Sequence, residues 1–321
     1  FWLCGACEQT TMADGTSLGL GMRMVLGATG GMGAAVCCHP LDVVRVQLQI
    51  DGGSAGTKQY KGTGDAIVQI IKRNGVLRGL YPGIDAAFLR QWTYGSCRLG
   101  IYAFLLDKVN STQAKGVPVP FWKKLLMGST AGAIGSFVGT PSEIALVRMG
   151  ADSKLPEAEK RNYKNVIDCC LRISREEGVA KLWNGATPTI IRATLLSASV
   201  LACYSEAKVE LYKAFPTVFK DKEGIPLMFT STMFASLVAN VVSNPFDVVK
   251  SRIQNMPVPS PGEKPIYSGM GDCFVKSVKG EGPMVLYKGF TPAFVKLAPY
   301  TCISLILVDK MTKLVTGKSA M

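Results

Sequence analysis

The chain has few charges and almost no histidine. Only 18% of its 321 residues are Asp, Glu, Lys or Arg, whereas 48% are hydrophobic and the mean hydropathy is +0.22. A chain this apolar is not expected to fold as several soluble domains, and its composition places it in a lipid bilayer. Since His39 is the single histidine, catalysis or metal binding based on histidine has nothing to build on.

Other absences exclude further classes of protein. Cys4 and Cys7 form a C-x-x-C, but no second pair completes a zinc site. Residues 30–33, Gly-Gly-Met-Gly, look like a nucleotide-binding loop but lie inside an apolar segment and follow no predicted strand. We therefore expect no metal site, no catalytic residue and no enzyme. Residues 1–18 hold no clear cleavable signal peptide and are treated as an undefined leader.

Long apolar runs are also missing, yet six segments are long enough to span a membrane. No window holds the run of about 20 apolar residues that a simple span contains. Mixed apolar and small residues fill six segments, as is typical of helices with one face on lipid and the other on a water-filled cavity. They cover roughly residues 20–48, 83–109, 121–149, 185–214, 227–254 and 289–315. The sequence predicts an all-α membrane protein with six spanning helices.

A proline-led cluster of charges recurs three times, at Pro40, Pro141 and Pro245. The period is about 100 residues, so each repeat must be one supersecondary unit. Together the three units predict one integral domain with threefold pseudo-symmetry. The predicted repeats are residues 19–115, 116–220 and 221–321.

The charges in this cluster predict a gate. Proline interrupts a helix, and an acid and a base three residues apart beyond it share one face. In a threefold bundle the acid of one kinked helix can reach the base of the next, which closes a ring across the pore. The alternative is that each acid pairs with the base of its own helix. The charged residues concerned are Asp42, Arg45, Glu143, Asp247 and Lys250, and Leu146 stands where the second repeat should have a base.

A cation stands at one register of every repeat, seven residues beyond an aromatic-x-Gly triplet: Arg90, Arg192 and Lys296. Arg98 lies two turns further along the helix of Arg90. Cations at membrane depth are costly unless they face water and an anion. A dicarboxylate needs two separated cations, and arginine binds a carboxylate with two hydrogen bonds. We interpret these residues as a binding site for a small dianion, with snorkelling to the head groups as the alternative.

Between the two spans of each repeat lies a Tyr-led segment, roughly residues 62–72, 163–175 and 268–278, which we expect to form a short helix on the membrane surface. The amino ends of these helices and the triplets offer free backbone amides to lipid phosphates. Alternatively, the aromatic residues only anchor the interface. The candidate lipid-binding residues are Tyr60, Gly62, Gly83, Tyr163, Trp183, Gly185, Tyr267, Gly269, Tyr287 and Gly289.

The net charge of +13, from 36 basic and 23 acidic residues, favours anionic partners. A basic surface attracts anionic lipid head groups and concentrates anionic solutes. Nucleic acid is not an expected partner, because the cations lie within or between predicted membrane segments rather than on one soluble face.

Taken together, these motifs resemble the mitochondrial carrier family, whose repeated signature is P-x-[DE]-x-x-[KR] followed by an aromatic-[KR]-Gly triplet. The resemblance covers about residues 20–315, with Leu146, Pro82 and Asn184 as substitutions in the motifs. It implies six tilted helices around a central cavity in the mitochondrial inner membrane, alternating between outward-open and matrix-open states. It also implies short helices on the matrix side and bound cardiolipin.

The resemblance implies roles for the gate residues. The proline-linked charges would form a matrix-side network in which Asp42, opposite Leu146, stays unpaired. Gln49 and Gln254 stand where the family places a glutamine brace beneath the ion pairs. The expected pairs are Arg45 with Asp247 and Glu143 with Lys250. The family's second gate, on the cytoplasmic side, is degraded here to the acids Asp107, Glu206 and Asp309.

The substrate is also implied by resemblance. Segments 89–102, 139–149 and 252–256 are similar to family members that exchange 2-oxoglutarate for malate, although those members have arginine at position 296. The implied substrate contacts are Arg90, Gln91, Arg98, Arg192 and Lys296. Two alternatives stay open. Lys296 could favour another small anion, as in dicarboxylate/phosphate or uncoupling-type carriers. The weak second gate also permits a transport-impaired structural subunit of a larger inner-membrane complex.

Overall fold

The computed structural model describes residues 19–52, 59–112, 119–152, 160–215, 225–256 and 265–316. Within these ranges all regular secondary structure is helical, with no β-strand. The prediction of an all-α fold is confirmed for this part of the chain. The leader, residues 1–18, lies outside the described residues, as do the predicted repeat boundaries after residues 115 and 220.

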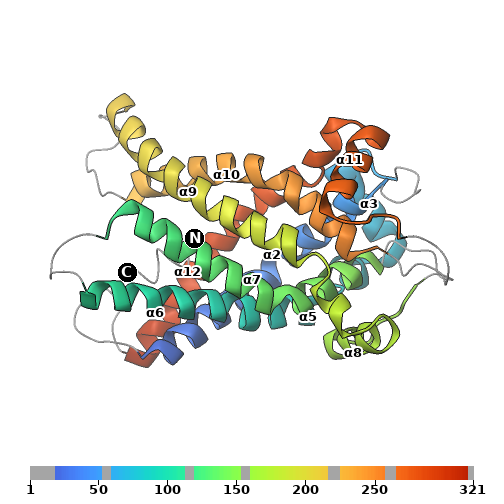
Figure 1. Cartoon of the computed structure of the whole chain (residues 1–321), viewed down its shortest axis with the longest axis horizontal. Coiled ribbons are helices and arrows are strands. Elements are labelled where there is room, and N and C mark those ends of the chain that lie inside the picture. The colour runs from blue at the N-terminus through green and yellow to red at the C-terminus, as the bar shows by residue number, and fades with distance from the viewer. Residues whose placement is uncertain are drawn as a thin grey trace.

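Each repeat contains a long helix, a short helix and a second long helix that follows a brief helical turn (Figure 1). The first repeat has α2 (Leu20–Ile50), α3 (Thr63–Asn74), α4 (Val76–Leu80), α5 (Ile84–Arg90), the π-helical turn η1 (Gln91–Gly95) and α6 (Ser96–Thr112). The second has α7 (Phe121–Asp152), α8 (Val166–Glu176), the 3-10 turn η3 (Val179–Trp183) and α9 (Ala186–Ala214). The third has α10 (Ile225–Gln254), α11 (Met270–Glu281), the 3-10 turn η4 (Pro283–Tyr287) and α12 (Phe290–Thr316).

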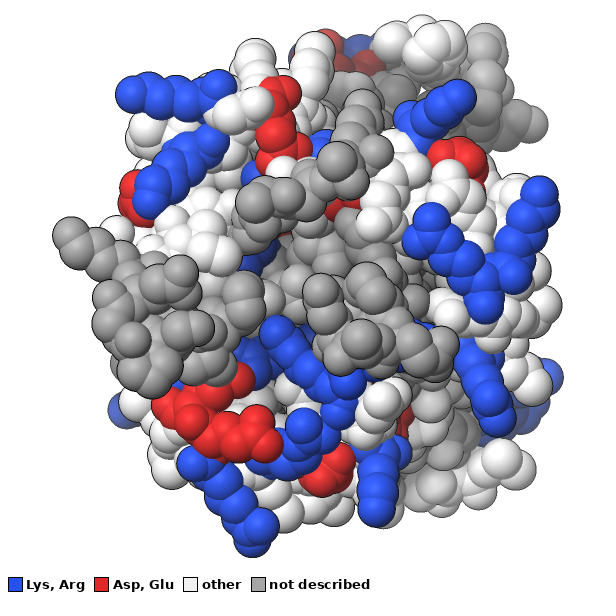
Figure 2. Space-filling view, turned by 90° about the vertical axis from the view of Figure 1, so that its right-hand side faces the viewer, with Lys and Arg blue, Asp and Glu red and all other residues white. Residues whose placement is uncertain are grey.

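The long helices form a closed ring. They run along the long axis of the molecule, and α3, α8 and α11 gather at one end (Figure 1). Each long helix contacts the next in chain order, and α12 packs against α2, so the last helix meets the first. Viewed onto the end with the short helices, basic side chains are numerous around the periphery (Figure 2).

The prolines of the repeated motif lie inside α2, α7 and α10 rather than at their ends. In two repeats the residue before the proline donates a side-chain hydrogen bond to the turn that precedes the next long helix. His39 Nε2 donates to the carbonyl oxygen of Pro82 at 2.9 Å, and Asn244 Nδ2 donates to that of Leu286 at 2.8 Å. The one histidine therefore has a structural role.

Glycines let neighbouring helices approach α2 closely. A Cβ atom on Gly27 would lie 2.5 Å from Leu99 of α6, and one on Gly30 would lie 2.5 Å from Val308 of α12. A side chain at either position would force Leu99 or Val308 to move, and such close contacts are the usual reason for small residues where membrane helices touch. The glycines thus explain how α2 can pack between α6 and α12.

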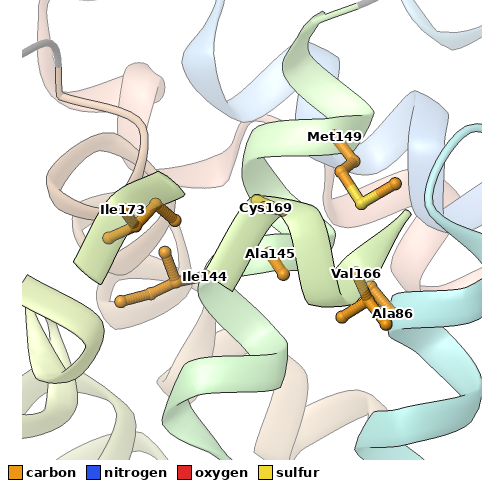
Figure 3. Close-up of a cluster of buried hydrophobic side chains, with 7 residues drawn as sticks. All are labelled: Ala86, Ile144, Ala145, Met149, Val166, Cys169 and Ile173. Atoms are coloured by element: carbon orange, nitrogen blue, oxygen red, sulfur yellow. The ribbon is translucent and has the colours of Figure 1, made fainter. Parts of the chain in front are cut away.

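The short helices form where the sequence predicts them, and each buries one face. In α8, Cys169 and Ile173 are four residues apart and pack against Ile144 and Ala145 of α7 (Figure 3). Ala86 of α5, from the first repeat, belongs to the same cluster. The cluster therefore joins the first repeat to the second. The position of these helices on a membrane surface stays a prediction.

Three helical stretches are long and apolar enough to cross a membrane, judged by length and composition: Met24–Ile50, Val179–Ala214 and Pro283–Val315. The other predicted spans are also long helices, namely α5 to α6, α7 and α10. Length and composition alone do not qualify them, so the count of six crossings stays a prediction.

Candidate functional site

The six predicted spans alternate along the chain: α2, α7 and α10 are the odd-numbered spans, and α5 to α6, α9 and α12 are the even-numbered ones. Two inter-repeat ion pairs join the odd-numbered spans just beyond their prolines. Arg45 Nη2 of α2 lies 2.5 Å from Asp247 Oδ2 of α10, and Lys250 Nζ of α10 lies 2.5 Å from Glu143 Oε2 of α7. Both acids are nearly buried. These are the pairs that the family resemblance implies, and they connect repeats rather than residues of one helix, so the alternative of local pairing is wrong.

Asp42 is also paired, and the expectation that it has no partner is wrong. Lys296 Nζ of α12 lies 2.7 Å from each of its carboxylate oxygens. The residues of the sequence motif all lie on odd-numbered spans. Lys296 lies on an even-numbered span, α12, and reaches Asp42 because α12 packs against α2. An unpaired carboxylate at a nearly buried position is costly. Lys296 therefore provides the positive charge that Leu146 does not provide.

The remaining cations predicted to bind a dianion join the same acids. Arg90 Nη1 lies 3.9 Å from Glu143 Oε1, and Arg192 Nε contacts Asp247 Oδ1. The structure thus brings together three cations from three different repeats. We call the whole set the central network: Asp42, Glu143 and Asp247 with Arg45, Lys250, Arg90, Arg192 and Lys296.

Gln91 and Arg98 follow Arg90 on the same span. Gln91 is buried, and Arg98 Nη1 donates to the hydroxyl of Tyr94 at 3.1 Å. In a regular α-helix, residues eight apart point about 80° away from each other. The π-turn η1, which lies between Arg90 and Arg98, holds an additional residue and rotates Arg98 back toward the face of Arg90.

The predicted glutamine brace is not formed in the described part of the chain. Gln49 and Gln254 are both buried next to the network. Gln49 Oε1 accepts from Ser251 Oγ at 2.6 Å, and the amide of Gln254 has no hydrogen-bond partner. Their side chains instead lie against the helix-start glycines Gly289 and Gly185, where a Cβ atom would come within 3.1 and 3.0 Å of them.

The opposite end of the bundle has no comparable network among the described residues. Asp107 and Glu206, two acids of the degraded second gate, are exposed and take part in no ion pair there. Asp309, the third, is half-buried. The described ion pairs of the proline-linked acids therefore lie toward the end with the short helices, whereas Asp107 and Glu206 make none at the other end.

Two ion pairs of buried arginines were not predicted from the sequence. Arg148 Nη2 donates to Glu177 Oε2 at 2.8 Å, with the arginine side chain only 1% exposed. Arg252 Nη1 lies 2.6 Å from Glu281 Oε1. Each base lies seven residues beyond a motif proline, and each acid immediately precedes a glycine. This repeated spacing was a usable signal, although the first repeat lacks it because Gln47 and Asn74 stand at these places.

The structure divides the candidate lipid-binding residues into groups. Tyr60 and Tyr267 are buried in hydrophobic clusters, so their side chains are not exposed to lipid, and their part in lipid binding stays a prediction. Trp183 Nε1 donates to the carbonyl oxygen of Phe137, and Arg172 lies over the ring of Tyr163. Tyr287 is exposed. Gly83, Gly185 and Gly289 have φ values of 72°, 85° and 78° and start α5, α9 and α12, a left-handed conformation that suits glycine.

The short helices differ at their amino ends. Gly62 precedes α3 and Gly269 precedes α11, and neither end has a side-chain cap. In α8, Asn165 Oδ1 accepts from the amide of Asp168, and Asp85 accepts from that of Val166. Two amides of the second repeat are therefore already occupied by the protein.

Comparison with known proteins settles the family. A sequence profile described as mitochondrial carrier protein matches residues 17–112, 117–215 and 221–319. The chain belongs to the mitochondrial carrier family. The three matches coincide with the three structural repeats, so the central network is built from equivalent positions of successive carrier repeats.

Individual carriers are similar over nearly the whole chain. The mitochondrial 2-oxoglutarate/malate carrier of Rattus norvegicus is 44% identical over 292 residues, which cover 91% of this chain and 90% of the relative. That of Caenorhabditis elegans is 42% identical over 290 residues, 90% and 91% of the two chains. The mitochondrial dicarboxylate carrier of the same species is 38% identical over 301 residues, 94% and 96% of the two chains.

Proposed function

We propose that this protein exchanges 2-oxoglutarate for malate or a related dicarboxylate across the mitochondrial inner membrane. One observation carries the proposal: Arg90, Arg192 and Lys296, one from each repeat, all contact carboxylates of the same network. Groups that bind carboxylates of the protein can bind those of a substrate. The relatives named as 2-oxoglutarate/malate carriers support this substrate, and the protein is a transporter rather than an enzyme.

Competition for these cations provides a mechanism of alternating access. Six tilted helices would cross the membrane around the network, with α3, α8 and α11 on the matrix side. In the present state the ion pairs close the matrix end, and the exposed Asp107 and Glu206 leave the other end open. A dicarboxylate that binds the cations replaces protein carboxylates, which offsets the cost of separating buried ion pairs. An empty carrier lacks this compensation, so transport is an exchange.

Anionic lipid, with cardiolipin as the expected species, would bind at the matrix-side rim. The uncapped amino ends of α3 and α11 support this proposal, because backbone amides there are free to bind phosphate. Exposed bases on the short helices, such as Lys72, Arg175 and Lys279, add attraction to anionic head groups. The capped α8 is a weaker candidate.

Reconstitution tests the transport proposal. Liposomes that contain the protein and internal malate should take up labelled 2-oxoglutarate. Arg90→Ala should abolish uptake because one carboxylate of the substrate loses its cation. Lys213→Ala is the control, since this basic residue is 66% exposed on α9 and pairs only with Glu210 on the surface among the described residues, and it should leave uptake unchanged. Normal uptake by Arg90→Ala would remove this residue from the site.

A panel of anions distinguishes the alternative substrates. Lys296 is the observation that favours a different anion, because an ammonium group is a point charge and not a bidentate donor. Preferential exchange of phosphate or of short dicarboxylates would assign the protein to another type of carrier. Absence of exchange with every anion, together with purification in a fixed complex, would support a structural subunit instead.

A further inference from the structure

The three acids of the central network have unequal numbers of cationic partners. Glu143 contacts Lys250 and Arg90, and Asp247 contacts Arg45 and Arg192. Asp42, in contrast, makes its ion pair with Lys296 alone within the described ranges. Loss of one cation would leave the first two acids paired, but it would leave Asp42 without a partner.

The pairing rule between repeats explains why Asp42 needs a substitute. The base five residues beyond the proline always meets the acid of another repeat, as Arg45 and Lys250 show. Applied to the second repeat, the rule places position 146 opposite Asp42. That position holds Leu146, which packs against the hydrophobic cluster between α7 and α8. No base from an odd-numbered span is therefore available to Asp42.

The geometry of Lys296 suits this vacant position. Its ammonium nitrogen is 2.7 Å from both oxygens of Asp42, and both side chains are 15% exposed. The same nitrogen lies 4.9 Å from the ring centroid of Tyr300, a cation–π contact that holds it in place. A compact ammonium group can lie between two carboxylate oxygens, and its position on α12 makes the bond a link from the last spanning helix to the first.

We propose that Lys296 is the third base of the matrix gate, in place of the base that Leu146 does not provide. The inference rests on the proposed exchange function. A substrate carboxylate that binds Lys296 withdraws the one ion-pair partner of Asp42, so the link between α2 and α12 opens when an anion is present. Arg90 and Arg192 can bind substrate while Lys250 and Arg45 keep their acids paired. Lys296 is thus the residue that transmits substrate binding to the gate.

A rescue experiment tests this role separately from substrate binding. Lys296→Met should weaken the closed state and raise unidirectional malate efflux, into buffer without counter-substrate, roughly tenfold, which corresponds to about 1.4 kcal/mol. It should also lower the unfolding temperature. Adding Leu146→Lys should return both values toward those of the wild type, because the new ammonium group faces Asp42. Exchange should stay impaired, since the substrate has still lost its own cation.

The controls make the outcome decisive. Leu146→Met in the Lys296→Met background changes the side chain without adding charge and should rescue nothing. If Leu146→Lys lowers efflux no more than this control, the proposal is wrong. Should Lys296→Met fail to fold, Leu146→Lys alone provides the test: a second base near Asp42 should reduce efflux and raise the unfolding temperature, and no change in either overturns the proposal.

The two proposals can fail independently. If the wild-type protein exchanges another anion, efflux of that anion replaces malate efflux as the readout. Rescue of the unfolding temperature by Leu146→Lys would then support the gate role of Lys296 while the proposed substrate is rejected. Conversely, normal 2-oxoglutarate exchange without any rescue would reject the gate role alone.

Discussion

Glutamine in place of Glu177 should destabilise the protein far more than the same change at the preceding residue. Glu177 binds the buried guanidinium of Arg148 through both carboxylate oxygens. Glu176 is its matched control, because it pairs with Arg172 on the surface, where the two side chains are 61% and 36% exposed. The two variants therefore differ in the burial of the partner and not in chemistry.

The magnitudes follow from that difference in burial. Removing one member of a buried ion pair costs roughly 3–5 kcal/mol, and the lower value applies here because glutamine keeps one acceptor oxygen. At about 2–4 °C per kcal/mol, Glu177→Gln should lower the unfolding temperature by roughly 6–12 °C. An exposed pair four residues apart contributes about 0.5 kcal/mol, so Glu176→Gln should lower it by roughly 1–2 °C.

Thermal unfolding in detergent, followed with a dye that fluoresces on reaction with thiols, measures both shifts. Cys38, Cys169 and Cys273 are buried in the folded protein, so their thiols react with the dye only when the protein unfolds. Equal shifts for Glu176→Gln and Glu177→Gln would refute the reasoning. A double variant, Arg148→Met with Glu177→Leu, should recover most of the loss, because no uncompensated charge stays buried.

Two further predictions concern groups at the end with the short helices. Burial acts to raise the pKa of Glu281, but hydrogen bonds from Arg252 and Lys288 hold it below the usual 4.5. Its ionised form therefore stabilises the fold above pH 4.5, and this contribution is lost as the pH falls further; the acid-induced drop in unfolding temperature should be smaller in Glu281→Gln. Burial raises the pKa of the Cys169 thiol to about 12, so mass spectrometry after alkylation at pH 8 should find it unmodified until the protein unfolds.

Features that depend on the pattern within one repeat were predicted correctly from the sequence. The observed bounds of α2 (Leu20–Ile50) and α9 (Ala186–Ala214) lie within about two residues of the predicted segments. The period of the repeats indicated that acids and bases of neighbouring repeats meet in a ring, and the family resemblance implied the specific pairs of Arg45 with Asp247 and of Lys250 with Glu143. Local patterns and their period contain this information.

Sequence reasoning failed where a contact joins positions that are not equivalent. Asp42 was expected to be unpaired because the motif contains no base from an even-numbered span. The contact of the Tyr60 hydroxyl, which donates to the buried Gln47 at 2.8 Å, was not predicted either. The recurrence of a tyrosine in every repeat was compatible with an exposed or a buried side chain, and only the structure distinguishes the two.

The sequence alone determined the number of repeats, the helices within each repeat and the register of the charges, because these depend on spacing along one segment. Tertiary structure decided which charges meet. The base that pairs with Asp42, Lys296, comes from α12, and it reaches Asp42 because α12 packs against α2. Such a contact depends on how closely two helices approach, which glycines such as Gly30 permit and no periodicity along the chain records.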